Sequence, residues 1–417
     1  MHTALRLVLC CLALFACGCA ARQPDAAQPG TQNASQSYGR GQLVLPDGTP
    51  AQDRAVANLL RGADYIILGE RHDSAVDHIA QARVLRLLAD SGQKTALGLE
   101  MLPRNTFAPE LEKYLSGALS ISQLPEAVRW STNWGYDFKL YQPIFAEARR
   151  QAMPIAGLNI PQDIRATVSK KGLKGLTPKQ KAALPAKIHD APEEHKTALA
   201  STFLMHAAMR VKAGGRQTGA GSKERLVLPV PVTGAKKGQS ATVNLPISLK
   251  KPFERFLLVQ NLWDSTMAEE AAALHAKSGL PVVLAAGAGH SQKGRGIAYR
   301  LPFFDPKARI IHVMPFSGTA PDAKQADLFY YSPPEGHSRY GFVFTAANGT
   351  FSVKEVIPGS KAAKAGILAG DIIAKAGGLP VRSGSDLHRA AFAARTTGKV
   401  LELVVRRGSK DVTVRLP

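Results

Sequence analysis

The nine residues Tyr65–Asp73 constrain the fold of this chain more than any other stretch. The apolar run Tyr65–Leu68 leads directly into Gly69, and a carboxylate and an imidazole follow at Glu70 and His72. The next residues carry an apolar stripe at helical spacing, formed by Val76, Ile79, Ala80, Val84, Leu87 and Leu88. The pattern predicts a buried strand, a tight turn and a helix. Open α/β sheets bind ligands in the crevice at their strand ends, so Glu70 and His72 are the first candidate site residues. In the alternative interpretation, Asp73 or Ser74 only caps the helix and Glu70 is solvated.

Three further buried strands end in polar or glycine-rich positions. Residues 95–99 lead into Glu100, residues 154–158 into Asn159, and residues 281–286 into a glycine-rich turn with His290. A last strand is expected at 308–314. Helical patterns alternate with these strands, which predicts an α/β domain with a mostly parallel sheet and flanking helices. Glu70, His72, Glu100 and His290 would then meet at one sheet edge, where two carboxylates can share a proton or the group can hold zinc or manganese. His78, six residues after His72, is expected on the helix surface.

Aromatic side chains gather between Trp130 and Tyr141, although aromatics make up only 6% of the chain. The segment includes Trp134, Tyr136 and Phe138. Two interpretations remain open at this stage, a pocket for a flat apolar ligand and the packing of a helix junction.

The chain is strongly basic, with a formal net charge of +21 over 417 residues. Such a charge attracts anions such as lipid headgroups or carboxylated ligands. The Lys and Arg residues are dispersed and no basic, aromatic-interleaved recognition motif is present, so nucleic acid is not an expected partner. The length allows two or more domains.

All four cysteines, Cys10, Cys11, Cys17 and Cys19, lie within the first 19 residues. An apolar run from Leu7 to Phe15 after Arg6 is typical of a secretory signal and is short for a transmembrane helix. The following residues resemble a bacterial lipobox with Cys17, or alternatively Cys19, as the acylated cysteine. Residues 1–19 are therefore expected to be a lipoprotein signal, residues 20–41 a polar tether, and the outer membrane the destination, the protein facing the periplasm or the surface. A cleaved signal without lipidation is the alternative.

The body is expected to divide into an α/β domain at 42–318, a linker at 319–338 and a second domain at 339–417. Within the first domain, residues 213–250 alternate Gly, Lys, Val and Pro. They are interpreted as a basic insertion or hairpin.

Six short motifs in fixed order, from Gly69-Glu70-Arg71-His72-Asp73 to Gly287-Ala288-Gly289-His290, give the α/β domain a family resemblance. The others are Glu100, Gly157-Leu158-Asn159, Gln260-Asn261-Leu262-Trp263-Asp264 and Met267-Ala268. The region resembles the ChaN-type haem-binding uptake lipoproteins of the Tiki-like superfamily. The resemblance implies haem binding, an outer-membrane lipid anchor and a homodimer that shares haem. The superfamily also includes metal-dependent proteases and erythromycin esterases with similarly placed Glu and His residues.

The C-terminal region resembles a bacterial PDZ domain. The resemblance rests on Tyr340-Gly341-Phe342-Val343-Phe344, Pro358-Gly359-Ser360, Ala365-Gly366 and Gly370-Asp371-Ile372-Ile373. PDZ domains add the C-terminus of a partner to a sheet edge. Tyr340–Phe344 would supply the backbone amides for the peptide carboxylate, and His388 would face the groove from a helix at 385–395. The alternative is a PDZ domain that only packs against the first domain.

Three functions follow from these features. In the first, the protein binds haem through an axial His or Tyr, and the candidates are Tyr141, Tyr136, His72 and His290. Arg71 would pair with a propionate of the haem. The PDZ domain would recruit an envelope protein. In the second, Glu70, His72, Glu100 and His290 hold a metal and activate water as a hydrolase. In the third, the protein is an envelope scaffold. The sequence leaves enzymatic activity open.

Overall fold

The computed structural model describes residues 38–212, 225–231, 240–318, 320–333, 335–347 and 349–416. The expected signal, Cys17, Cys19 and most of the tether lie outside these residues, as do 213–224 and 232–239 of the basic insertion. Within the described ranges, no helix is both long and apolar enough to cross a membrane.

The α/β domain is built on a sheet whose strand order is β1-β9-β8-β2-β7-β3-β4. All neighbouring strands are parallel except β1 and β9. This confirms the predicted fold class. The strands are β1 (Leu43–Val44), β2 (Tyr65–Glu70), β3 (Ala96–Pro103), β4 (Ile155–Asn159), β7 (Val282–Gly287), β8 (Ile310–Phe316) and β9 (Leu328–Tyr331).

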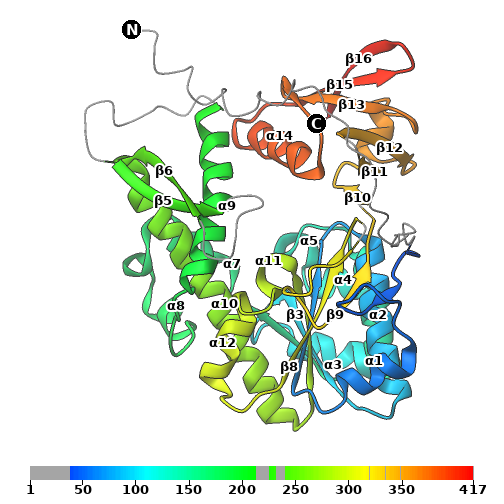
Figure 1. Ribbon diagram of the computed structural model, residues 1–417, viewed down its shortest axis with the longest axis vertical. Helices are drawn as coiled ribbons and strands as arrows, with labels where there is room; N and C mark the ends of the chain where they lie inside the picture. Colours follow the sequence, from blue (N-terminus) through cyan, green and yellow to red (C-terminus); the bar gives the residue numbers. More distant parts are fainter. Residues whose placement is uncertain are drawn as a thin grey trace, which may run out of the picture. The chain divides into compact units, whose positions relative to one another are not determined.

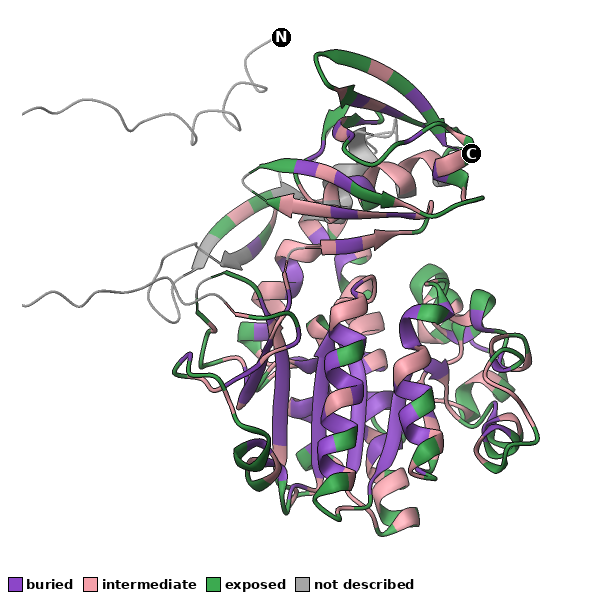
Figure 2. Cartoon of the chain, turned by 90° about the vertical axis from the view of Figure 1, so that its right-hand side faces the viewer, coloured by how far each residue is buried: buried purple, intermediate pink, exposed green. Residues whose placement is uncertain are grey.

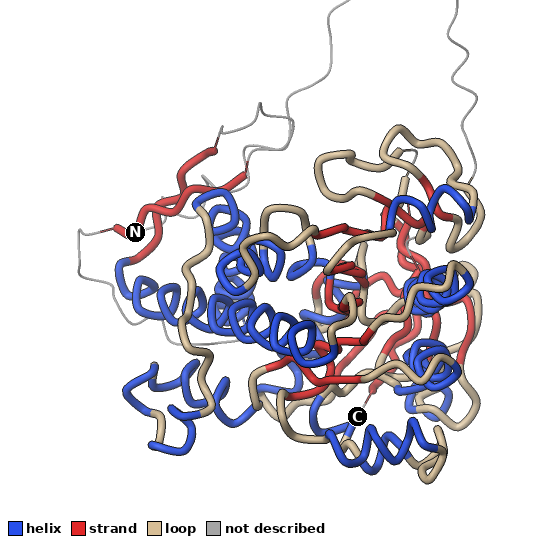
Figure 3. Tube along the Cα trace, turned by 90° about the horizontal axis from the view of Figure 1, so that it is seen from below, coloured by secondary structure: helices blue, strands red, loops and turns tan. Residues whose placement is uncertain are grey.

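Helices cover both faces of this sheet (Figures 1 and 3). Along β2, Ile66 and Leu68 join the core on one face, whereas Tyr65 and Ile67 join the core on the other, as the two-residue period of a strand requires. The central strands are therefore buried along their length (Figure 2). The first face packs against α1 (Asp53–Leu60), α2 (Ala75–Asp90), α3 (Ala108–Ser116) and α6 (Phe138–Arg150), and the second against α10 (Lys250–Ser278) and α12 (Gly296–Phe304).

Shorter elements complete the domain. Two single turns, α4 (Leu124–Ala127) and α5 (Trp130–Asn133), precede α6, and α11 (Ala288–Ser291) follows β7. On the α10 side lie α7 (Gln162–Lys171), η2 (Leu173–Gly175), α8 (Pro178–Ala182) and α9 (Glu193–Lys212). Within the expected insertion, β5 (Arg225–Pro231) and β6 (Ser240–Pro246) form an antiparallel hairpin, and η3 (Ile247–Leu249) leads into α10.

The C-terminal region forms an antiparallel sheet in the order β10-β11-β12-β13-β15-β16, with β14 on β13. Its elements are β10 (Glu335–Ser338), β11 (Phe342–Ala347), β12 (Thr350–Val356), α13 (Lys361–Lys364), β13 (Ile372–Ala376), β14 (Leu379–Pro380), α14 (Gly384–Thr396), β15 (Leu401–Arg407) and β16 (Lys410–Leu416). It has a separate apolar core that includes Phe342, Phe351 and Leu403.

The segment 319–338 differs from the expected linker. Its residues 328–331 form β9, which pairs with β8 and β1 inside the α/β sheet, and residues 335–338 form β10 in the second sheet. The α/β domain therefore ends with β9, beyond the last strand that the sequence predicted.

Candidate functional site

The carboxyl ends of β2, β7 and β3 lie side by side and bring four predicted site residues together. Glu70 ends β2 opposite Gly287 of β7, and Glu100 lies in β3 on the other side of β7. His72 follows β2, and His290 lies in the short helix α11 after β7. As expected from the sequence, one edge of the sheet brings together Glu70, His72, Glu100 and His290.

Two histidines at this edge are each held by a carboxylate. His72 Nδ1 hydrogen-bonds to Glu70 Oε1 at 2.9 Å, and His290 Nδ1 hydrogen-bonds to Asp264 Oδ1 at 2.5 Å. In both pairs the ring nitrogen Nε2 is left for other partners. His290 Nε2 lies 3.8 Å from Glu100 Oε1.

Gly287 lets the His72 ring approach the end of β7. A Cβ atom at residue 287 would lie 2.8 Å from His72 Nε2 and 3.5 Å from Glu100 Oε2. The backbone amide of Gly287 also donates to Glu100 Oε2 at 2.6 Å. Any larger residue at 287 would collide with the His72 ring, so the glycine belongs to the site.

The charges of this group follow from its neighbours. Burial alone would lower the pKa of His290, but the Asp264 and Glu100 carboxylates raise that pKa to about 9. Burial alone would raise the pKa of Glu70, but His78 and His72 hold it well below its usual range. The pKa of His72 is also raised, because the hydrogen bond to Glu70 and the charge of Glu100 outweigh its burial. At neutral pH, Glu70 is therefore ionised and His290 is protonated.

Two residues that the sequence did not assign to the site contribute to it. His78 is fully buried, not on the surface as expected, because α2 begins at Ala75 after the Ser74 cap and its first turn faces the crevice. Its Nε2 lies 3.3 Å from Glu70 Oε1. Asp264 also forms an ion pair with the fully buried Arg300 at 3.1 Å. A carboxylate in the middle of an otherwise apolar helical stripe was the available signal for Asp264.

Two predicted haem-binding residues are engaged inside the protein. The Tyr141 hydroxyl is buried and donates to Glu70 Oε1 at 2.8 Å, so it does not face a ligand. Burial and the charge of Glu70 raise its pKa well above the usual value. Arg71 pairs with Asp77 at 3.2 Å and bonds to Ser332 and to the Pro333 carbonyl. These partners already engage the guanidinium that the sequence analysis expected to pair with a propionate.

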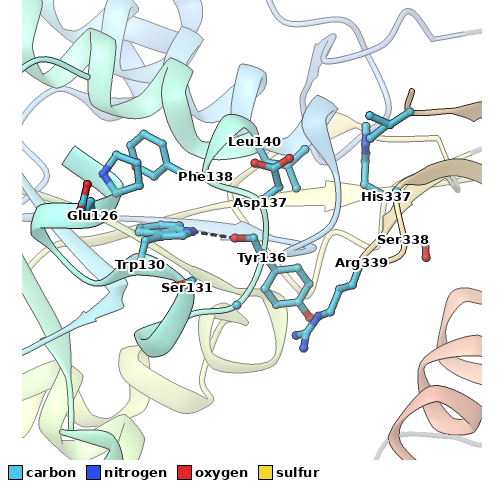
Figure 4. A pocket seen from close by; sticks show the side chains of 14 residues that line it. Glu126, Trp130, Ser131, Tyr136, Asp137, Phe138, Leu140, His337, Ser338 and Arg339 are labelled. Atoms are coloured by element: carbon cyan, nitrogen blue, oxygen red, sulfur yellow. Dashed lines mark hydrogen bonds between the residues drawn. The ribbon is translucent and has the colours of Figure 1, made fainter. Parts of the chain in front are cut away.

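Tyr136 lies on the wall of a pocket of about 640 Å³ (Figure 4). The pocket has Trp130, Phe138 and Leu140 on one side and the segment 337–339 on the other. The Arg339 guanidinium lies 4.3 Å from the centre of the Tyr136 ring. Arg339 has no carboxylate partner among the described residues. Burial raises the pKa of the Tyr136 phenol, and Arg339 opposes that rise.

The aromatic segment joins this pocket to the crevice. The His72 ring lies 4.7 Å from the Trp134 ring and 5.3 Å from the Tyr136 ring. Trp134 Nε1 donates to the Tyr141 hydroxyl at 2.9 Å. Within this segment, Trp130 packs against α6 and Tyr136 lines the pocket.

The geometry does not favour the metal site predicted at Glu70, His72, Glu100 and His290. Within the part of the chain that the structure describes, no group of three or more His, Cys, Asp or Glu side chains has the arrangement of a metal centre. Glu70 Oε1 is already shared by His72 and the Tyr141 hydroxyl. The zinc or manganese alternative thus has no support from these residues.

Of the predicted peptide-binding residues, Tyr340 and Gly341 lie in the turn before β11, Phe342–Phe344 lie in β11, and His388 lies in α14. Phe344 and His388 line a second pocket of about 480 Å³. However, the amides of Tyr340 and Gly341 already bond to Ser338, and β11 is paired with β10 along Phe342–Thr345. The expected free edge is therefore occupied by the chain itself.

Comparisons with known proteins agree with both halves of this description. The family model for haem-binding uptake proteins of the Tiki superfamily, ChaN, matches residues 56–301, and a PDZ domain model matches residues 352–407. No functionally curated protein matches the chain.

Several solved structures are similar to parts of the chain. ChaN of Campylobacter jejuni, whose structure is described as showing cofacial haem binding, is 18% identical, with a TM-score of 0.49 over 69% of this chain and 96% of that chain. The erythromycin esterase EreC is 13% identical, with a TM-score of 0.36 over 79% and 89%. The PDZ domain of HtrA3, bound to a phage-derived ligand, is 36% identical, with a TM-score of 0.15 over 17% and 64%. The family model that matches residues 56–301 covers more than half of this chain. The chain therefore belongs to the ChaN family of haem-binding uptake proteins in the Tiki superfamily, and a PDZ domain follows the family region.

Proposed function

We propose that the protein binds haem in the pocket beside Tyr136. The observation that carries the proposal is the pairing, on one aromatic-lined pocket, of a phenol and a guanidinium without a carboxylate partner among the described residues. A haem presents a flat apolar face, an iron that accepts a tyrosine ligand and anionic propionates that pair with arginine. The pocket volume lies within the range of about 300 to 1,000 Å³ that is typical of ligand sites. Membership of the ChaN family supports the same function.

The residues present fit this cofactor in a defined way. Tyr136 would ligate the iron, Arg339 would pair with a propionate, and Trp130 and Phe138 would contact the macrocycle. Haem supplies the iron chemistry, whereas the chain supplies the site's shape, its charge and exclusion of water. Tyr141 is not a ligand in this arrangement, since its hydroxyl bonds to Glu70. His290 bonds to Asp264 through Nδ1, which leaves only its Nε2 atom for a ligand. His72 lies against Tyr136 and remains the second candidate.

Replacing Tyr136 by phenylalanine is expected to weaken haem binding. Titration of the purified full chain with haemin should give a saturable Soret shift in the wild type and a Kd at least about tenfold weaker in Tyr136→Phe, because the variant lacks the ligand oxygen. Tyr141→Phe is the matched control and should keep the Soret shift. Loss in Tyr141→Phe with retention in Tyr136→Phe would overturn the assignment.

A second function is favoured by the two histidine and carboxylate pairs that converge on Glu100. A protonated His290 can donate a proton to a leaving group, and the Glu100 carboxylate can accept one from water. We propose ester or amide hydrolysis as the alternative activity of this crevice. Glu100→Gln should then reduce turnover of p-nitrophenyl acetate by about 10²-fold or more and leave the haemin titration unchanged. Equal turnover by the wild type and Glu100→Gln would contradict the proposal that this crevice is a hydrolase site.

The remaining parts of the proposal concern location and partners. Acylation at Cys17, or alternatively Cys19, would tether the protein to the outer membrane, and the PDZ domain would take the C-terminus of an envelope protein. Metabolic labelling with palmitate, lost in Cys17→Ala, tests the anchor. A homodimer that shares haem, expected from the resemblance, stays a prediction that a mass measurement with and without haemin checks.

A further inference from the structure

The edge on which a PDZ domain accepts its peptide is filled by the chain's own β10. Strand β11 pairs with β12 on one side and with β10 on the other. The antiparallel register with β10 places Gly336 opposite Phe344 and Ser338 opposite Phe342. A peptide that adds to a sheet needs an unpaired edge. A partner can therefore join β11 only if β10 leaves it.

Strand β10 also ends where a peptide carboxylate would lie. Its last residue, Ser338, accepts the Gly341 amide through its carbonyl at 2.9 Å and the Tyr340 amide through its hydroxyl at 3.1 Å. These amides belong to the loop from which a PDZ domain binds a terminal carboxylate. Beside it, Phe344, Leu387 and Ala391 line the 480 Å³ pocket between the hairpin and α14. Ser338 thus stands in for the last residue of a ligand.

The other edge of β10 contacts the crevice. The His337 amide donates to the carbonyl of Asp73 at 2.7 Å, and Asp73 directly follows the site residue His72. Glu335 forms an ion pair with Arg40. One residue after β10, Arg339 lies over Tyr136 and completes the pocket wall with His337 (Figure 4). The same strand therefore closes the PDZ groove and forms one wall of the proposed haem pocket.

We propose that β10 is a built-in ligand of the PDZ groove, that a protein C-terminus must displace it, and that displacement takes His337 and Arg339 away from the pocket beside Tyr136. The inference rests on the peptide-binding function proposed above. A tethered strand competes at a high effective concentration, of millimolar order for short linkers. A free peptide of ordinary affinity therefore binds the wild type weakly, and its binding is coupled to haem release.

The first test weakens β10 without changing the groove. A Cβ atom at Gly336 would lie 2.4 Å from Phe344 Cζ and 2.9 Å from Asp73 Oδ2. The Phe344 ring is buried and stacked on Phe351 at 4.4 Å, so it cannot move aside easily. In the full-length Gly336→Val variant, β10 should leave β11. The probe is a synthetic peptide of residues 332–338 with a free carboxylate at Ser338, and its amidated form is the control.

The probe is expected to bind Gly336→Val at least about tenfold more tightly than the wild type, because the internal competitor is lost. Adding Ala391→Phe to this variant fills the groove and should abolish binding, and circular dichroism checks that each variant is folded. Equal affinity for the wild type and Gly336→Val would contradict the proposal that β10 competes with the peptide. It would leave the peptide-binding function itself supported. Binding to neither protein would overturn the peptide-binding function itself, and the displacement with it.

The second test locks β10 in place. His337 and Val343 are directly opposed, and the His337 amide points to Asp73, so they form a non-hydrogen-bonded pair with Cα atoms about 4.5 Å apart, which a disulfide can bridge. The double variant His337→Cys and Val343→Cys is made in the full chain with its four native cysteines changed to serine.

Tryptophan emission reports the coupling, because Trp130, Trp134 and Trp263 all belong to the α/β domain and the probe contains no tryptophan. Millimolar probe should change the emission of the reduced form and leave the oxidised form unchanged. An equal change in both forms would show that the peptide acts elsewhere and overturn the proposal.

Discussion

Replacing Asp264 by asparagine is expected to lower the free energy of unfolding by about 3 to 5 kcal/mol, although the side chain keeps its size. Asp264 is the carboxylate between the buried Arg300 and the partly buried His290. It lies 3.1 Å from Arg300 Nη1, whose side chain is 0% exposed, and 2.5 Å from His290 Nδ1. The amide leaves the buried guanidinium without a charged hydrogen-bond partner among the described residues, since the other acceptors of Arg300 are the neutral oxygens of Asn261, His189 and Gly296.

Urea denaturation of the wild type and Asp264→Asn measures this loss. Asp411→Asn is the matched control, because Asp411 pairs with Arg406 at 3.0 Å but both side chains are more than half exposed. An exposed pair of this kind contributes about 0 to 1 kcal/mol. If the two variants lost the same stability, Asp264 would not hold the charge balance of the core.

The sequence predicted the centre of the α/β domain well, because its strands are continuous apolar runs. Such runs mark strands that are buried on both faces, and β2, β3, β4 and β7 begin within a residue of their expected positions. Since parallel strands end at the same sheet edge, Glu70, Glu100 and His290 could be placed together. The short strands β1 and β9 have too few residues for such a pattern, and their pairing joins segments from opposite ends of the domain.

The direction of individual side chains could not be predicted, since it depends on contacts distant in sequence. Tyr136 and Tyr141 are five residues apart, yet one lines the pocket and the other bonds to Glu70, 71 positions away in the sequence. Arg71 is held partly by Ser332, 261 positions away. In β10, two prolines precede the short Glu335–Ser338 segment, which lacks alternating apolar residues, and composition alone therefore favoured a linker.

The pH dependence of the free energy of unfolding should report the charge on His290, the second cation beside Asp264. The pKa of His290 is about 9 in the folded protein, against about 6.5 for an unperturbed histidine. Below about pH 6.5, both states bind the proton and the stabilisation is fully present. As the pH rises through 9, the folded state must release a proton that Asp264 and Glu100 stabilise. From the difference between these pKa values, His290 should contribute about 3 kcal/mol at acid pH that is lost at alkaline pH.

Urea unfolding at about pH 6 and about pH 10, on either side of the window between the two pKa values, measures this contribution in the wild type and in His290→Gln. The variant corrects for other groups that titrate in the same range, including His72, and its stability should fall less than that of the wild type. Arg300 and burial both oppose protonation of His290, whereas Asp264 and Glu100 favour it. The measurement decides which of these two opposing effects is larger. A difference of the opposite sign, with the wild type gaining stability as the pH rises, would mean that burial wins and that His290 is neutral beside Asp264. Such a histidine could not act as the acid of the hydrolase proposed for the crevice, and only the proposal of haem binding in the pocket beside Tyr136 would remain.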